Sequence, residues 1–504
     1  MRDSGGYSGA GGSRGSVARR RLEPVKPKRK LSTAGLVLVI LLIICCTAGA
    51  AVAGLVGVLP TWALVLVVGI ELIAVVGLSA MLLTSSIKSH QVRFWVATGL
   101  AVVVMIANLS AVKLAIDVMH FGQDIQERPD DTVLYDVVVL NNGPTDISQL
   151  SGSLMGEVGE DKLSQAVHNK IATLVNVNFV TSTPWTTTVA DLTASIVSSI
   201  VIEDAHLQVL QDADPATFDA LRVLTSFHID KSMAGWTPTA PVTTPPVEPS
   251  HAFVVYISGI DTYGAITNQA RSDVNMLMVV NPTSGRILLV NTPRDFYVQL
   301  RGTTGLKDKL THAGVYGIDT SVGTLEDLYN ITIDYYVRIN FSSLVAVVDA
   351  LGGVDVDSEY TFSTGGYSFV KGMNYNLSGA AALAFSRDRY DFAGGDRVRG
   401  ENQQRVITGI IHKLSNPTVL VGYQRILTSV GNSVQTSMSM DFISAQVKQQ
   451  IATNRGWQIS AVSVTGGDAS EYTHSYPGQR LYVMMPDPAS VDEAKAQIES
   501  VING

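Results

Sequence analysis

Three long apolar stretches near the N-terminus constrain the fold of this chain most strongly. They run from Leu36 to Leu59, from Trp62 to Leu83 and from Phe94 to roughly Leu114, and they are almost free of charge. Each has about twenty residues, the length that a helix needs to cross the hydrocarbon core of a bilayer. We therefore predict three transmembrane helices within residues 34–118, with a lipid bilayer as a partner of the chain.

The charges around these stretches predict how the chain is oriented in the membrane. Residues 1–33 hold nine basic and two acidic residues, and Lys88 and Arg93 lie between the second and third stretches. Basic segments stay on the cytoplasmic side, so we expect a disordered cytoplasmic tail over residues 1–33 and an extracellular location for everything after about Met119. We interpret the basic run as a topology signal, and no nucleic-acid partner is expected.

The remaining chain is predicted to form two α/β parts. Residues 130–235 combine a strand from Val133 to Leu140 with helical patterns at Asp161 to Thr173 and Val189 to Val201, which indicates a small accessory α/β domain. Residues 236–250 are rich in Pro and Thr and form an extended linker. Strands alternate with helices over residues 251–504, which predicts a mixed sheet flanked by helices.

Three apolar runs at the start of this last part predict a site at one sheet edge. The runs cover Ala252 to Ile257, Val274 to Val280 and Ile287 to Val290, with a turn at Asn281 to Gly285. If they pair as hairpins, Asp261, Asp273 and Arg294 converge at one edge. Carboxylates beside a guanidinium suit a phosphate that is bridged by Mg²⁺.

A second polar stretch supplies further cations. The segment Ala381 to Arg389 is interpreted as strand-like, which places Arg387 and Arg389 on one face. After Gly394 and Gly395, Asp396 is expected to cap a helix on which Arg399 and Gln403 stand four residues apart. Four arginines and two acids would then surround one polyanion.

Six short segments resemble the LytR-CpsA-Psr (LCP) family in order and spacing over residues 250–504. The segments are Gly259-Ile260-Asp261, Ala270-Arg271-Ser272-Asp273, Thr292-Pro293-Arg294-Asp295, Lys309-Leu310-Thr311-His312-Ala313, Ser386-Arg387-Asp388-Arg389-Tyr390 and Asp396 to Gln404. One position departs from the family pattern. The last motif of the family carries a second arginine where this chain has Asn402.

The resemblance implies a Mg²⁺-dependent phosphotransferase in the cell membrane, with an extracellular LCP-type catalytic domain. Its donor would be a polyprenyl-pyrophosphate-linked glycopolymer, of the teichoic acid or capsular polysaccharide type, and its acceptor peptidoglycan. The implied roles are catalytic for Arg294, Arg387, Arg389, Arg399 and Gln403, substrate-binding for Arg271, Lys309, Arg338, Asp396 and Gln404, and metal-binding for Asp261 and Asp273.

Several alternatives stay open at this stage. The general base could be Asp261, Asp273 or His312. Apolar residues from Leu344 to Leu351 could line a tunnel for a lipid tail or simply fill a core. Two other functions fit the same residues: hydrolysis of the polyprenyl pyrophosphate with water as acceptor, and a non-catalytic, membrane-bound regulator of envelope synthesis.

Overall fold

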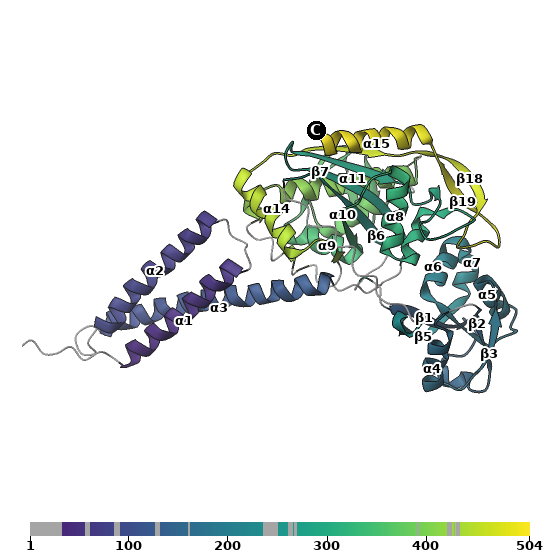
Figure 1. The fold of residues 1–504 in the computed structure, drawn as a ribbon, viewed down its shortest axis with the longest axis horizontal. Coiled ribbons are helices and arrows are strands. Elements are labelled where there is room, and N and C mark those ends of the chain that lie inside the picture. The colour runs from purple at the N-terminus through teal and green to yellow at the C-terminus, as the bar shows by residue number, and fades with distance from the viewer. Residues whose placement is uncertain are drawn as a thin grey trace, which may run out of the picture. The chain divides into compact units, whose positions relative to one another are not determined.

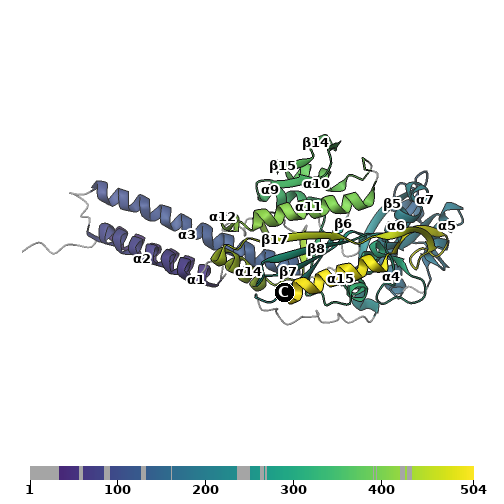
Figure 2. The same ribbon diagram turned by 90° about the horizontal axis from the view of Figure 1, so that it is seen from above.

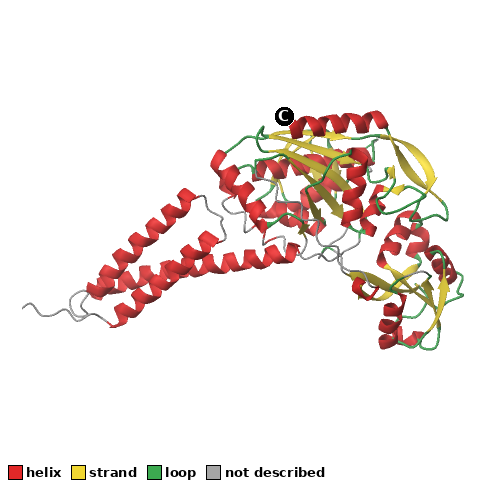
Figure 3. Cartoon of the chain, viewed as in Figure 1, coloured by secondary structure: helices red, strands yellow, loops and turns green. Residues whose placement is uncertain are grey.

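In the computed structural model of the chain, helices and strands are placed along most of the 504 residues (Figures 1 and 3). The structure describes residues 33–55, 61–84, 91–126, 132–159, 162–234, 250–260, 266, 270–389, 391–392, 394–420, 426–427, 429 and 434–504. Nearly all of the basic tail and of the Pro-rich linker, and the predicted metal ligand Asp261, lie outside these residues.

The three apolar stretches form long helices, α1 (Thr33–Leu55), α2 (Thr61–Thr84) and α3 (Gln91–Gln126). Each contains at least 20 residues that are apolar enough to cross a membrane, which confirms the prediction of three candidate spans. Leu42, Leu82 and Ala97 are fully buried where the helices pack together, while most other apolar side chains of these helices stay exposed. Such an apolar exterior suits contact with lipid rather than water.

Residues 132–230 form a five-stranded sheet with helices, in the strand order β3-β2-β4-β1-β5. Strand β1 pairs antiparallel with β4 and β5, and β2 pairs parallel with β3 and β4. The elements are β1 (Thr132–Leu140), β2 (Leu154–Val158), α4 (Ser164–Leu174), β3 (Asn178–Ser182), α5 (Trp185–Thr193), β4 (Ser199–Glu203), α6 (Asp204–Ala213), α7 (Pro215–Asp219) and β5 (Leu221–Asp230). We call this part the accessory domain.

Residues 250–504 are built around a six-stranded mixed sheet in the order β16-β11-β6-β7-β8-β17. The elements are β6 (Phe253–Ile260), β7 (Ser272–Asn281), β8 (Arg286–Thr292), β9 (Tyr297–Val298), β10 (Asp308–Lys309), η4 (Leu310–Tyr316), α8 (Ile318–Tyr329), β11 (Tyr335–Ile339), α9 (Phe341–Ala350), β12 (Val354–Ser358), β13 (Phe362–Thr364), β14 (Tyr367–Phe369), β15 (Gly372–Leu377), α10 (Gly379–Arg387), α11 (Asp396–Leu414), α12 (Pro417–Leu420), β16 (Val434–Thr436), α14 (Met440–Thr453), β17 (Gln458–Ser463), β18 (Gly466–Tyr472), β19 (Arg480–Pro486) and α15 (Pro488–Asn503).

The strand pairing brings four chain segments to one edge of this sheet. Strands β6, β7 and β8 form two successive antiparallel hairpins, as predicted, and β11 runs parallel to β6. The ends of β6, β8 and β11 and the start of β7 therefore share one edge. In the paired strands, Gly259 lies opposite Val274 and Asn275 lies opposite Thr292. Asp273 comes just before Val274 and Arg294 two residues after Thr292, so both residues lie at this edge.

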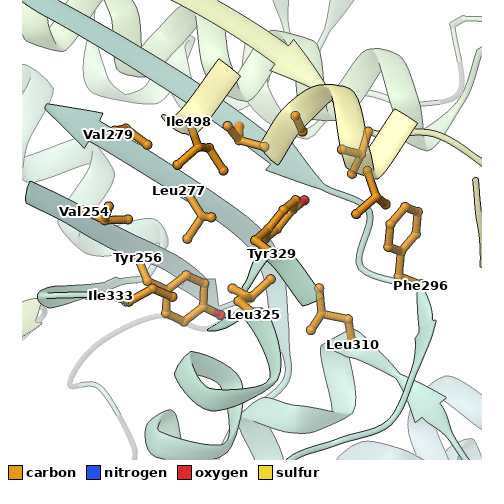
Figure 4. Close-up of a cluster of buried hydrophobic side chains, with 14 of the residues drawn as sticks. Val254, Tyr256, Leu277, Val279, Phe296, Leu310, Leu325, Tyr329, Ile333 and Ile498 are labelled. Atoms are coloured by element: carbon orange, nitrogen blue, oxygen red, sulfur yellow. The ribbon is translucent and has the colours of Figure 1, made fainter. Parts of the chain in front are cut away.

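Helices cover both faces of the sheet, which confirms the predicted fold class (Figure 2). On one face, Tyr256 and Leu277 of the central strands pack against Leu325 of α8 and Ile498 of α15 (Figure 4). On the other face, alternate residues such as Val255 and Leu289 pack with Phe442 of α14, and Ile407 and Ile411 of α11 pack against the same cluster. Successive side chains of a strand point to opposite faces, so buried strands such as these are apolar at almost every position.

Three local predictions were wrong. Residues Gly379–Arg387 form helix α10 instead of a strand, because its alanines favour a helix and Ser378 caps it by accepting from the backbone N–H of Ala381. The helical pattern at Val189 to Val201 is interrupted, since α5 ends at Thr193 and Ser199 begins strand β4. Gly395 rather than Asp396 is the N-cap residue of α11, and Asp396 lies in its first turn.

Candidate functional site

A cavity of about 510 Å³ opens at the sheet edge where the hairpins end. Its wall is formed by strands β6, β7 and β11, the segment after β8, helices α9, α10 and α11, and the end of helix α6 with the start of α7. The lining residues are Gln211, Asp212, Pro215, Ile257, Gly259, Ile260, Arg271, Asp273, Val274, Arg294, Ile339, Asn340, Phe341, Leu344, Leu383, Ser386, Arg387, Arg389, Arg399, Gln403, Val406 and Ile407. Five arginines and two aspartates are among them, so the polar part of the cavity suits a polyanion.

Asp273 and Arg294 form the polar centre of this cavity. Nη1 of Arg294 lies 3.0 Å from Oδ1 of Asp273, and Oγ1 of Thr311 donates to the same oxygen at 3.2 Å. Burial alone would raise the pKa of Asp273, but the guanidinium groups of Arg294, Arg271 and Arg399 outweigh burial and hold that pKa below its ordinary value. Asp273 is therefore ionised at neutral pH, as a metal ligand or a proton acceptor has to be.

Helices α10 and α11 bring the second group of arginines to the same cavity. Arg387 is the last residue of α10, and its guanidinium lies 4.0 Å from the ring centre of Phe341, which holds it by a cation–π contact. Arg399 is in the first turns of α11, where its Nη2 is 2.6 Å from Oδ1 of Asp396. Arg389 and Gln403 also line the cavity. The two distant sequence stretches thus meet at one site.

Arg338 and Gln404, both predicted to bind substrate, are buried and are not among the residues that line the cavity. Arg338 is 1% exposed, and its Nη1 donates to Oε1 of Gln435 at 3.0 Å. Gln404 donates to the backbone carbonyl oxygens of Leu289 and Val462 at 3.2 and 2.8 Å, and these bonds tie α11 to the sheet. Asn402, at the position that departs from the family motif, is also buried and accepts a hydrogen bond from Arg405.

Lys309 and His312 lie in a buried network behind the cavity. Nζ of Lys309 is 3.3 Å from Oδ1 of Asp295, and Nδ1 of His312 is 2.7 Å from Oδ1 of Asp308. Burial alone would lower the pKa of His312, but the charge of Asp308 and the contact with Asp212 outweigh burial and raise it to about 9. His312 is therefore protonated at neutral pH, where it cannot accept a proton as a general base.

Asp212 is a site residue that the sequence analysis missed. It lies on α6 of the accessory domain, yet its carboxylate faces cations that belong to residues 250–504. These are Nζ of Lys309 at 2.7 Å, Nη2 of Arg294 at 3.5 Å and Nη1 of Arg271 at 3.5 Å. No local motif marks this aspartate. Its position depends on contacts between residues 59 or more positions apart in the chain, which a pattern in the sequence does not reveal.

The other part of the cavity wall is apolar. Ile257, Ile339 and Val274 come from the strands, Phe341 and Leu344 from α9, Leu383 from α10, and Val406 and Ile407 from α11. Of the residues considered for a lipid tunnel, Leu344 lines the cavity, whereas Val348 is fully buried and Leu351 nearly so in the neighbouring core. The cavity therefore joins a cationic part to an apolar part.

Comparison with known proteins gives consistent matches to one family. The LytR_cpsA_psr family matches residues 223–495. The polyisoprenyl-teichoic acid–peptidoglycan teichoic acid transferase TagU of Enterococcus faecalis is 37% identical over 233 residues, which are 44% of this chain and 76% of that protein. The TagU of Bacillus anthracis is 36% identical over 196 residues, 39% of this chain and 63% of that protein. The crystal structure of B. subtilis TagV matches 50% of this chain and 98% of its own, at 26% identity and a TM-score of 0.43.

Proposed function

Because the chain belongs to the LytR-CpsA-Psr family, we propose that it is a membrane-anchored phosphotransferase that moves a polyprenyl-pyrophosphate-linked glycopolymer onto peptidoglycan. Its relatives from E. faecalis and B. anthracis are named as transferases of teichoic acid from a polyisoprenyl carrier to peptidoglycan. A glycopolymer of the teichoic acid or capsular polysaccharide type is the proposed cargo. The observation that carries the proposal is the cavity, whose two parts match the two parts of such a donor.

The cationic part of the cavity fits the pyrophosphate. Arginine binds phosphate oxygens as a planar fork, and Arg271, Arg294, Arg387, Arg389 and Arg399 all line the cavity. Phosphoryl transfer requires positioned charge around the phosphorus more than covalent participation by the protein. This set of guanidinium groups supplies that charge.

The apolar part of the cavity fits the first isoprene units of the carrier. Phe341, Leu344 and Leu383 present hydrocarbon surface next to the guanidinium of Arg387. Transfer of apolar surface from water is favourable by about 25 cal/mol per Å², so even a few isoprene units would add to the affinity for the donor. A free sugar phosphate, which lacks a lipid, would leave this wall unused.

In the proposed reaction, a hydroxyl group of peptidoglycan attacks the phosphorus that carries the glycan. A new oxygen–phosphorus bond forms, the bond to the bridging oxygen breaks, and polyprenyl monophosphate leaves. Asp273 is the proposed acceptor of the hydroxyl proton, since it is an ionised carboxylate that lines the cavity, whereas His312 is already protonated. Arg294 and Arg387 stabilise the charge on the phosphate oxygens.

Mg²⁺ is proposed as the cofactor. Asp273 fits this role because Mg²⁺ is usually held by one or two carboxylates together with phosphate oxygens, and Asp273 offers an ionised carboxylate to the cavity. Asp261 is the second proposed ligand and lies outside the described residues. When bound, the ion would neutralise charge on the pyrophosphate.

The proposed orientation puts the cavity outside the cell. Three helices long enough to span a bilayer precede the accessory domain. Basic residues flank them in the tail, at Lys88 between α2 and α3, and at Arg93 near the start of α3. Because basic residues stay in the cytoplasm, an odd number of spans leaves the following chain on the opposite side. Peptidoglycan, the proposed acceptor, is on that side.

The function is tested with the full-length protein in lipid vesicles, a lipid-linked teichoic acid donor and peptidoglycan. We expect peptidoglycan-bound glycan as the product, and a loss of about a hundredfold or more in rate for Arg387→Ala. Arg480→Ala is the matched control, because Arg480 is exposed on β19, and it should keep the wild-type rate. Release of free glycan would instead show a hydrolase, and donor binding without any turnover would show a regulator.

A further inference from the structure

The end of helix α6 reaches from the accessory domain into the cationic part of the cavity. Gln211 and Asp212 of α6 and Pro215 of α7 line the cavity together with the arginines. Gln211 accepts a hydrogen bond from Nη2 of Arg271 at 3.0 Å, and Gln208 accepts one from the backbone N–H of the same arginine at 2.9 Å. One wall of the cavity is thus not part of the six-stranded sheet or its helices.

Packing contacts of helices α5 and α6 hold this wall in place. The indole Nε1 of Trp185 donates to the backbone carbonyl of Ser475 at 3.1 Å, and its ring lies 5.6 Å from that of Tyr476. Leu207 and Leu210 of α6 belong to a buried apolar cluster that also includes Val315, Tyr476 and Leu481. The position of Asp212 is therefore fixed by a packed interface and not by its own ion pairs alone.

Asp212 is surrounded by cations. Lys309, Arg294 and Arg271 lie at 2.7, 3.5 and 3.5 Å, and Nε2 of His312 lies at 3.6 Å. Its side chain is only 7% exposed. Burial alone would raise the pKa of Asp212, but the contact with protonated His312 and the charges of Lys309 and Arg294 hold that pKa far below its ordinary value. Asp212 thus keeps its charge at neutral pH.

This negative charge has two opposing consequences for a bound pyrophosphate. It fixes the direction of the Arg294 guanidinium, which faces Asp273 on one side and Asp212 on the other. It also repels any anion in the same cavity, since like charges at short range disfavour each other in a partly buried site. A residue that only stabilised the fold would not show both effects.

We propose that Asp212 is a positioning residue for phosphoryl transfer, through which the accessory domain completes the cationic site by orienting Arg294 and Arg271. The proposal rests on the function proposed above and deepens it. Asp212 lowers the affinity for the pyrophosphate while it raises the rate of the reaction, because the oriented guanidinium groups match the geometry of the transferring phosphate.

The test is Asp212→Asn in the full-length protein, because asparagine keeps the shape and removes the charge. Affinity is measured with farnesyl pyrophosphate in detergent micelles, and turnover with lipid-linked donor and peptidoglycan. We expect affinity to rise by roughly tenfold as one repelling charge is removed. Turnover should fall by roughly ten- to a hundredfold as the arginines lose their orientation.

Two further variants separate charge from fold. Asp219→Asn removes an acid that is exposed at the end of α7 and should match the wild type in both measurements. Asp212→Glu keeps the charge but moves it by one methylene. Its affinity for farnesyl pyrophosphate should stay within about twofold of the wild type, and its turnover should lie between those of the wild type and Asp212→Asn. If the asparagine variant does not fold, the glutamate variant decides the test alone.

The proposal is overturned if Asp212→Asn weakens affinity and turnover together, or changes neither. It is also overturned if Asp212→Glu loses affinity and turnover to the same extent. A failure of the proposed function looks different, because the wild type itself would then transfer no glycan to peptidoglycan. The wild-type reaction therefore has to be measured beside each variant.

Discussion

The buried histidine His312 allows a prediction about pH and stability. Its ring is fully buried, with Nδ1 at 2.7 Å from Asp308 and Nε2 at 3.6 Å from Asp212. The pKa of His312 is about 9 in the folded protein, against 6.5 for an ordinary histidine. Because the folded pKa is the higher one, the stabilising contribution is complete below pH 6.5 and disappears as pH rises through 9.

The size of this contribution follows from the shift in pKa. Each pKa unit corresponds to about 1.4 kcal/mol, so the ion pairs of His312 account for about 3 kcal/mol of unfolding free energy between the two limits. Several other buried groups in the described part of the chain have pKa values outside the range from 6.5 to 9. The pKa values of Asp273 and Asp308 are lowered, that of His206 is about 4, and that of Tyr316 is about 12.

The assay is unfolding of the full-length protein in detergent, followed by tryptophan fluorescence between pH 6 and 9.5. We expect the wild type to lose about 3 kcal/mol more than His312→Gln over this range, because glutamine does not titrate. His228→Gln, which replaces an exposed histidine on β5, serves as the control and should follow the wild type. Parallel pH profiles for the wild type and His312→Gln would refute the reasoning.

Three more predictions concern the cavity and the domain interface. Leu344→Asn should raise the KM for a polyprenyl-linked donor by roughly tenfold and leave kcat unchanged, since Leu344 lines the apolar wall; steady-state kinetics with the lipid-linked donor checks this. Removal of Mg²⁺ with a chelator should stop glycan transfer and addition of Mg²⁺ should restore it, as measured by glycan bound to peptidoglycan. Trp185→Ala should lower the unfolding free energy by about 3–5 kcal/mol, because Trp185 is buried in the domain interface. Its turnover should fall as that of Asp212→Asn does. An unchanged melting transition would contradict the packing described for Trp185.

Much of the site was predictable because its residues follow the ends of recognisable strands. Hairpins are predicted by the apolar runs of β6, β7 and β8 and by the turn between β7 and β8. Pairing as hairpins places Asp273 beside Arg294. The spacing of Arg399 and Gln403 predicted a shared helix face, and both residues line the cavity. These predictions needed only periodicity and turn chemistry.

One secondary-structure prediction was wrong because the local pattern is ambiguous. The segment before Arg387 is short and apolar, and such a run fits a buried strand as well as a buried helix. Its alanines and the Ser378 cap decide for the helix α10. The sequence around Arg338 does not predict that this arginine is buried against Gln435, because its burial depends on which strand pairs with β11.

Composition and the spacing between near neighbours are enough to predict the three apolar helices, the hairpins of β6, β7 and β8 and the two clusters of charged residues. Three features are visible only in the folded chain: the clusters meet at one cavity, an apolar wall lies beside them, and Asp212 of the accessory domain faces Arg294 and Lys309. The reason is physical: ion pairs and cavities depend on distances of a few ångströms between residues far apart in the chain, and those distances are set by the packing of whole sheets and helices.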